Sequence, residues 1–150
     1  MTRQRRIHDK PVVYRRAVAT GELRLSARAR RAIRSGTVEK GDPLRIGEVA
    51  GLQALKRTSD LIPHCHPVPI TGSRVELRST STGVRATVEV EALYRTGVEM
   101  EALVGVSISL LTVWDTVKYL EKNAAGGYPS TRLGPVRVLQ KEKRSMEASA

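Results

Sequence analysis

One long segment with apolar residues at helical spacing constrains the fold of this chain more than any other feature. It runs from about Val98 to Lys122 and includes the stretch VEMEALVGVSISLLTVWDTVK. The apolar side chains that recur along it every three or four residues are Leu103, Val106, Leu110, Val113 and Val117. Residues at this spacing share one face of a helix, so the segment is predicted to be a long amphipathic helix and the main core element.

A β-hairpin is predicted directly before this helix. The stretches RVELRST and VRATVEVEALYR flank a Ser-Thr-Gly turn. In the second stretch four apolar residues alternate with charged or hydroxylated ones, and these are Val84, Ala86, Val88 and Val90. Alternation with a period of two places these side chains on one buried face of a strand, with the other face in solvent.

The rest of the chain mixes strands with helices. In order we expect an extended segment at 12–25, a short helix between Ser26 and Gly36, a turn at 39–43, a strand at 44–51, a helix at 51–62, the hairpin, the long helix, a Gly/Pro-rich loop at 124–135 and a short strand at 135–140. This order favours an α+β fold, and we predict a ferredoxin-like antiparallel sheet with helices packed on one face.

The length of the chain bounds its organisation. Its 150 residues suit a single domain, 1–150, in which residues 1–9 and 141–150 are expected to be flexible tails. No apolar run reaches the roughly 18 residues of a membrane span, and the N-terminus has no secretory signal. A single cysteine excludes an internal disulfide. We therefore expect a cytoplasmic protein with no membrane partner.

Positive charge is concentrated at the front of the chain. The formal net charge is +11, and Met1 to Arg34 holds eleven basic and two acidic residues. Such a segment attracts nucleic acid, an anionic membrane or a polyphosphate metabolite, or it is simply a solvated surface. Tyr14 is its one aromatic residue and it has no zinc-finger or RNP-type motif, so no specific nucleic-acid partner is expected.

The stretch LIPHCHPVPI gathers two of the three histidines and the one cysteine as His64, Cys65 and His66. In an extended segment the two imidazoles point the same way and could share a metal, but two ligands are too few for a zinc site. A redox role lacks a C-x-x-C partner. The alternative is a stiff ligand-binding loop, because prolines at 63, 67 and 69 restrict its backbone.

The long helix carries two further groups of polar residues. Asp115 and Lys118 are three residues apart and therefore neighbours on its surface, either as an incidental ion pair or as a functional one. Glu99 and Glu101 lie in its first turn, where carboxylates favour the helix dipole. Because Glu101 and Asp115 are about 21 Å apart along the axis, they share a face but not a pocket. If both are functional, the helix of one subunit is expected to complete a site of another.

Three more cations are candidates for phosphate binding. Lys40 lies in the predicted turn, and Lys56 and Arg57 lie late in the predicted helix at 51–62. Several such groups converging on one pocket would suit phosphate oxygens, whereas each residue taken alone is ordinary surface charge. The sequence contains no Walker loop and no G-x-G-x-x-G motif for a nucleotide.

Taken together, these stretches resemble the cyclic pyranopterin monophosphate synthase family of molybdenum cofactor biosynthesis, also called molybdenum cofactor biosynthesis protein C. The resemblance is carried by KGDPLRIGEVAGLQALKRTSDLIPHCHPVPI, GVEMEALVGVSISLLTVWDTVK and GPVRVL. These stretches cover most of the chain from Lys40 to Leu139. The order LIP-x-CHP, then GVEMEAL, then an aspartate and a lysine three residues apart, is highly specific.

The resemblance implies a ferredoxin-like subunit, a homohexamer built as a trimer of dimers, and active sites at subunit interfaces. It also implies a lyase reaction that converts 3′,8-cyclo-7,8-dihydroguanosine 5′-triphosphate to cyclic pyranopterin monophosphate and releases pyrophosphate. By motif, His64, Cys65 and His66 fall in one substrate-binding segment and Met100 and Glu101 in another. Asp115 matches the catalytic aspartate, and Lys118 and Lys40 match lysines important for the reaction.

Roles follow from this match. We expect Asp115 and Lys118 to act as a coupled acid/base pair, and His66 to hydrogen-bond the substrate or relay a proton. Lys40 and Lys56 should stabilise the triphosphate and the departing pyrophosphate, assisted by Arg57. No metal is expected in the protein itself and no cofactor is required, although Mg²⁺ is a candidate companion of the triphosphate.

Overall fold

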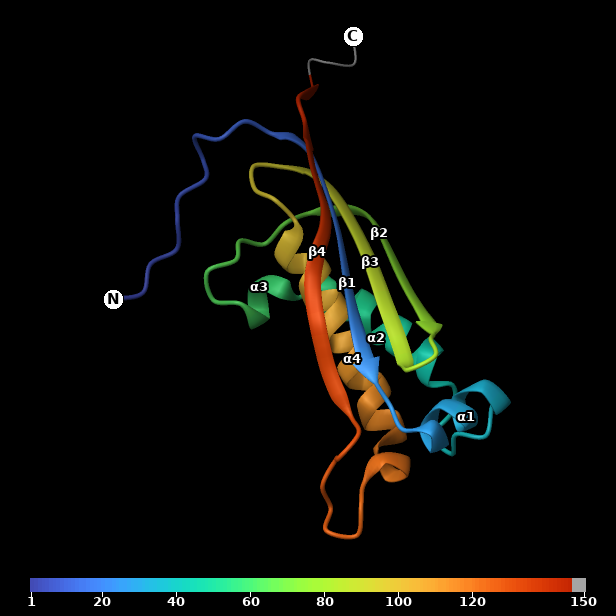
Figure 1. The fold of residues 1–150 in the computed structure, drawn as a ribbon. Helices are drawn as coiled ribbons and strands as arrows, with labels where there is room; N and C mark the ends of the chain where they lie inside the picture. Colours follow the sequence, from blue (N-terminus) through green and yellow to red (C-terminus); the bar gives the residue numbers. More distant parts are fainter. Residues whose placement is uncertain (147–150) are drawn as a thin grey trace.

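The computed structural model describes residues 1–146 of the chain. Its elements in chain order are β1 (Val13–Arg24), α1 (Ala27–Ser35), α2 (Pro43–Leu55), α3 (Thr58–Leu61), β2 (Ile70–Ser79), β3 (Gly83–Tyr94), α4 (Glu99–Glu121) and β4 (Arg132–Arg144). The strands form one antiparallel sheet in the order β2-β3-β1-β4 (Figure 1). A β-α-β-β-α-β chain path with this sheet is ferredoxin-like, which confirms the predicted fold class.

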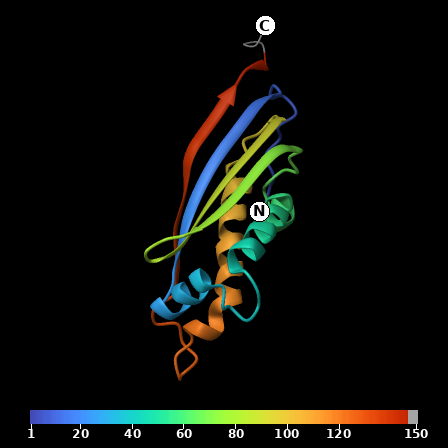
Figure 2. The same ribbon diagram turned by 90° about the vertical axis from the view of Figure 1, so that its right-hand side faces the viewer.

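The core lies between the sheet and the two long helices. Figures 1 and 2 show α2 and α4 on the same side of the sheet. The predicted inward face of β3 is buried, as are four of the five apolar positions named on α4, the fifth, Leu103, being half-buried. Both the hairpin and the long helix are therefore confirmed, because their apolar periodicity matches the surfaces that they bury.

The short helix α1 has the ends that the sequence predicts. Ser26 is its N-cap, and the Ser26 hydroxyl accepts a hydrogen bond from the backbone N–H of Ala29 at 3.2 Å. Gly36 ends the helix with a φ of 69°, a left-handed conformation in which glycine avoids the steric cost of a side chain. Local capping chemistry was sufficient to predict this element.

The prediction of a strand at 44–51 is wrong, since these residues belong to helix α2. Asp42 caps this helix by accepting hydrogen bonds from the backbone N–H groups of Leu44 and Arg45, and Pro43 occupies its first turn. Gly51 lies against α4, where an added Cβ would be 2.9 Å from the carbonyl oxygen of Gly105 and closer still to the Ser109 hydroxyl. The capping residues and close helix packing outweigh the short apolar alternation.

The helix predicted at 51–62 is also incorrect in its extent. Helix α2 already ends at Leu55, with Lys56 as its C-cap, and the four-residue α3 follows separately. At this break Thr58 is buried, and its hydroxyl donates to the carbonyl oxygen of Leu55 at 2.9 Å. A hydroxyl that bonds the preceding backbone offers an alternative to continuing the helix.

Strand β4 is longer than the predicted strand at 135–140, and it corrects the expected tail at 141–150. Residues 141–144 pair with β1, where Lys141 lies opposite Ala17 and Arg144 opposite Tyr14. The Arg144 guanidinium stacks over the Tyr14 ring at 4.4 Å from its centroid, a cation–π contact that helps to hold this edge segment against β1. Residues 147–150 of the predicted tail lie outside the described residues, and the flexibility of residues 1–9 stays a prediction.

Helix α4 also meets the length and composition of a membrane span, which the search for apolar runs in the sequence did not anticipate. Its most apolar window has a mean hydropathy of 1.4. Half of that window is buried inside the protein, against the sheet and α2. These are the properties of a helix that is apolar because it fills the core of a folded domain.

Candidate active site

One group of predicted residues meets near the C-terminal half of α4. The Lys118 ammonium forms an ion pair with Asp115, with 2.8 Å between Nζ and Oδ1. Lys40, from the turn before α2, donates from Nζ to the backbone carbonyl of Asp115 at 3.2 Å. The structure therefore brings Lys40, Asp115 and Lys118 together from segments that are 75 residues apart.

The charges in this group stabilise one another in an open position. The Asp115 side chain is 64% exposed. Its hydrogen bond with Lys118, followed by the charges of Lys118 and Lys40, lowers the pKa of the Asp115 carboxyl. The same hydrogen bond and charge raise the pKa of Lys118. The ion pair thus favours the ionised forms of Asp115 and Lys118 where a ligand can reach them.

A second group lies near the start of α4, where Glu101 is buried to 4% exposure. Burial is the main reason why the pKa of Glu101 rises to about 7, opposed by a backbone hydrogen bond and reinforced by the charge of Glu99. Burial, and then the charge of Glu101, raise the pKa of the Cys65 thiol. Cys65 and Glu101 therefore share one weakly solvated neighbourhood.

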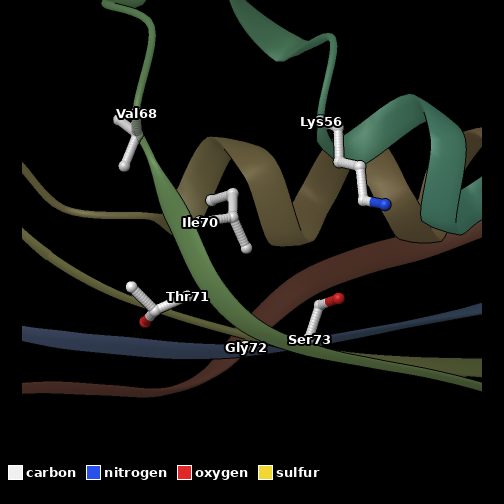
Figure 3. A pocket seen from close by; sticks show the side chains of 6 residues that line it. All are labelled: Lys56, Val68, Ile70, Thr71, Gly72 and Ser73. Atoms are coloured by element: carbon white, nitrogen blue, oxygen red, sulfur yellow. The ribbon is translucent and has the colours of Figure 1, made fainter.

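Two hollows adjoin this second group, and Lys56 lines both of them. The smaller, of about 60 Å³, is also lined by Glu101, Thr58 and Pro67. The larger, of about 330 Å³, lies between Lys56 at the end of α2 and the start of β2 (Figure 3). The Lys56 ammonium therefore lies between a cleft with a mixed polar and apolar lining and a buried carboxyl.

The loop that carries His64, Cys65 and His66 runs beside these hollows. The backbone N–H of Cys65 donates to the Ile62 carbonyl at 3.0 Å, and the Cys65 carbonyl accepts from the side chain of Gln4 at the same distance. His64 is exposed and His66 half-buried. Residues 1–146 contain no group of three or more His, Cys, Asp or Glu side chains that could hold a metal.

Met100 and Arg57, the remaining predicted residues, are exposed at the same end of the molecule. Met100 is in the first turn of α4, next to Glu101, and Arg57 precedes α3. The structure gives neither side chain a hydrogen bond or an ion pair within residues 1–146. Their exposure leaves both side chains open to a ligand, and no hydrogen bond or ion pair within the described part of the chain fixes them.

The predicted residues thus form two groups rather than one site. Glu101 and Asp115 are about 21 Å apart along α4 at 1.5 Å per residue. Helix α2 runs antiparallel beside α4, so that Lys40 before α2 reaches Asp115 and Lys56 after it reaches the neighbourhood of Glu101. We name these the Asp115 group (Lys40, Asp115, Lys118) and the Glu101 group (Lys56, His64, Cys65, His66, Met100, Glu101).

Sequence reasoning missed two charged residues near the Glu101 group, Lys141 and Arg15, and their effect on Glu99. Lys141 Nζ lies 2.7 Å from Glu99 Oε1. Burial raises the pKa of Glu99, but the contact with Lys141 and the charge of Arg15 help to lower it overall. Arg15 is buried, and its Nε has no hydrogen-bond partner within the described residues. The sequence could have indicated Arg15, because it alternates with the apolar residues Val13 and Ala17 on the inward face of β1.

Comparisons with known proteins identify the family of this chain. Residues 5–144 match the MoaC family. A protein of Methanosarcina acetivorans is 50% identical over 137 residues, which are 91% of this chain and 87% of that protein. One of Methanospirillum hungatei is 50% identical over 140 residues, with 93% and 90% covered, and one of Pyrococcus abyssi is 48% identical over 137 residues, with 91% and 86% covered.

Each of these three relatives is named a probable cyclic pyranopterin monophosphate synthase. The match spans all the strands and helices described above, and both polar groups of α4 lie inside it. On this evidence the chain belongs to the MoaC family.

Proposed function

We propose that this protein is a cyclic pyranopterin monophosphate synthase of molybdenum cofactor biosynthesis. It converts 3′,8-cyclo-7,8-dihydroguanosine 5′-triphosphate to cyclic pyranopterin monophosphate and releases pyrophosphate. The observation that carries the proposal is the Asp115 group, in which a carboxylate and two ammonium groups meet in a chain whose relatives bear this name. We place the enzyme in the cytoplasm.

The Asp115 group supplies acid/base chemistry and positive charge. Opening the substrate ring and building the pterin both move protons, and a ribose-derived hydroxyl must lose its proton as it attacks the α-phosphate. Asp115 and Lys118 exchange these protons as a coupled pair, so their titration belongs to the pair. As the bond between the α- and β-phosphates breaks, Lys40 stabilises the charge that develops on the leaving pyrophosphate.

The Glu101 group holds the rest of the substrate. With a pKa of about 7, Glu101 can either donate or accept a proton near neutral pH. His66 hydrogen-bonds the substrate or relays a proton, and Lys56 neutralises phosphate charge. Burial of Glu101 keeps water from its carboxyl and so strengthens the interactions that this carboxyl makes.

Two subunits are needed to bring the two groups together. A two-fold axis that crosses α4 midway between Glu101 and Asp115, near Ile108, places the Asp115 group of one copy beside the Glu101 group of the next, twice per dimer. This geometry is supported by residues that recur every three or four positions along α4 and therefore share one face of the helix. They are Glu101, Val104, Ile108, Leu111, Asp115 and Lys118.

Apolar exposure on this side of the protein also supports a dimer. Leu111 is 51% exposed between the two polar groups, and on the adjacent helix α2 Val49 is 57% exposed, flanked by Ile46 and Leu52. Exposed apolar side chains gathered on two packed helices are typical of an interaction surface. We propose that three such dimers form the homohexamer, with each active site at a subunit interface.

No resident metal or cofactor belongs to this proposal. Mg²⁺ is proposed only as a companion of the triphosphate, whose oxygens are the ligands that this ion prefers. The proposal includes no specific nucleic-acid partner and no membrane. Turnover measured with excess chelator and then with added Mg²⁺ separates a metal that accompanies the substrate from a reaction that proceeds without one.

The test is incubation of the purified protein with the cyclised GTP derivative, with pyrophosphate and the pterin product both measured. We expect the two products in equal amounts. The rival hypothesis, a nucleic-acid-associated module built on the basic N-terminus, predicts strong salt-sensitive binding to unrelated duplexes and no turnover. A catalytically idle subunit predicts neither result.

A further inference from the structure

A third hollow, outside both polar groups, lies between α1, the turn that follows it and the end of α4. Its volume is about 330 Å³. Its polar lining consists of Arg28, Arg31, Ser35, Thr37, Glu39 and Tyr119. Arg28, Arg31 and Ser35 recur at intervals of three and four residues, so they present one face of α1 to this hollow. The sequence singled out this arginine-rich segment, but the proposed reaction gives it no role.

The two arginines of this hollow have no side-chain partner within residues 1–146. Within residues 1–146 the structure gives the Arg28 and Arg31 guanidinium groups no hydrogen bond and no ion pair. Other arginines differ, since Arg16 pairs with Glu89 on the sheet and Arg30 donates to a backbone carbonyl. Two unpaired guanidinium forks side by side match the paired oxygens of phosphate groups.

Hydroxyl groups complete the lining. The Tyr119 oxygen accepts a hydrogen bond from the backbone N–H of Glu39 at 2.8 Å, which fixes the ring and leaves the phenol proton free for another acceptor. The hydroxyls of Ser35 and Thr37 are 3.0 Å apart, and the Ser35 hydroxyl also donates to the Arg31 carbonyl at 2.8 Å. Glu39 is the one carboxylate among the lining residues, so the net charge of the lining is positive. Such a lining favours an anion with several oxygens.

The hollow also adjoins the Asp115 group through the chain itself. Glu39 precedes Lys40, and Tyr119 follows Lys118. We propose that the hollow binds a pyrophosphate group beside the Asp115 group. The inference rests on the proposed function in one respect: the group is either the pyrophosphate that leaves the substrate or the end of the substrate triphosphate.

The experiment titrates inorganic pyrophosphate into the intact protein by calorimetry. The test variant is Arg28→Ala/Arg31→Ala, and the matched control is Arg24→Ala/Arg34→Ala, which removes the same charge from exposed positions outside the hollow. We expect at least about tenfold weaker binding for the test variant and less than about twofold for the control, since a paired contact exceeds general charge attraction. Equal affinity of the two variants would overturn the site.

Steady-state kinetics with the same variants identifies the source of the pyrophosphate group. If the free product occupies the hollow, the test variant loses product inhibition while its KM for substrate is unchanged. If the substrate triphosphate reaches the hollow, KM rises and kcat does not. The titration needs no turnover, so a protein that binds pyrophosphate through these arginines but forms no pterin would refute the proposed function and leave the site standing.

Discussion

The two ends of helix α4 carry carboxyl groups of opposite character. Near the start of the helix, Glu101 is buried, and its pKa rises to about 7. Fourteen residues later Asp115 is exposed, and its ion pair with Lys118 lowers its pKa. Since both side chains lie on one stripe of the same helix, the difference comes from their surroundings: the first faces the interior beneath the His64–His66 loop, and the second faces solvent and two ammonium groups.

The contrast shows how one helix can hold two carboxyl groups in different protonation states. Near neutral pH Glu101 is partly protonated, whereas Asp115 is ionised. Pairs of titratable groups whose pKa values are pushed apart by their environments are typical of acid and base roles in one reaction. In a single chain the two are too distant to act on one substrate, so the contrast has catalytic meaning only if a second chain closes the gap.

The largest effect is expected at the exposed end. Asp115→Asn keeps the size of the side chain but removes its charge and its capacity to accept a proton, so kcat should fall by about 10³-fold. The fold should be retained because the side chain is exposed. Asp9→Asn, which changes another exposed carboxylate, is the control. Near-normal turnover of purified substrate by Asp115→Asn would show that the exposed carboxyl of α4 has no catalytic role.

Lys118, the ion-pair partner of Asp115, provides a second test of the exposed end. Lys118→Met removes the ammonium that lowers the Asp115 pKa, so the acid limb of the pH–rate profile should move to higher pH and kcat should fall by about 10²-fold. Lys122→Met, one turn further along, serves as the control and should change neither. An unshifted acid limb in Lys118→Met would show that the ion pair does not set the reactive protonation state.

The buried end can be tested through stability. Folding raises the Glu101 pKa from its ordinary value of 4.5 to about 7, so the folded protein binds this proton more tightly than the unfolded chain. The resulting stabilisation is present below pH 4.5 and is lost as the pH rises through 7. Glu101→Gln cannot ionise, and above pH 7 it should exceed the wild type in stability by about 3 kcal/mol at most.

Denaturant unfolding of Glu101→Gln and wild type at pH 4 and pH 8 measures this difference. The gain should appear at pH 8 and be small at pH 4. Glu22→Gln is the control, because the Glu22 side chain is 44% exposed and ion-paired with Arg85. A Glu101→Gln variant with the same relative stability at both pH values would show that the two ends of α4 do not differ as described.

Helix α2 connects the Asp115 group and the Glu101 group, so displacing it should disturb the geometry of both. The expected loss of stability is the smallest effect among these predictions. At Gly51 an added methyl would press on Gly105 and Ser109 of α4. Gly51→Ala is expected to cost roughly 1–3 kcal/mol of stability because the two helices must move apart. Gln53→Ala, on the exposed side of α2, is the control. Unchanged thermal stability of Gly51→Ala would mean that α2 does not fix the spacing of the groups.

The sequence predicted the elements whose patterns are local. The hairpin of β2 and β3 and the core helix α4 follow from apolar periodicity, and α1 follows from its Ser26 and Gly36 caps. The strand wrongly predicted at 44–51 illustrates the limit of such patterns. Its alternation is brief, and the Asp42-Pro43 capping signal and the glycine contacts with α4 decided the outcome.

The sequence predicted which residues belong to the site better than it predicted how they are arranged. The spacing of Asp115 and Lys118 on a helix indicated their ion pair, and the separation of Glu101 from Asp115 indicated two groups. The raised pKa of Glu101 could not be predicted, because it depends on how deeply tertiary packing buries the first turn of α4. The contact between Glu99 and Lys141 also required the extension of β4, which depends on pairing with β1.

In the proposed assembly, the Asp115 group of one subunit and the Glu101 group of another form each active site. Subunit mixing of Asp115→Asn and Glu101→Gln, each expected to have little turnover alone because each lacks a proton-transferring carboxyl, tests this arrangement after dissociation and reassembly. A mixed dimer holds one intact site and one doubly altered site, so random 1:1 mixing should restore about a quarter of wild-type turnover. Turnover that stays at the level of the separate variants, although mixed oligomers are shown to form, would contradict the account.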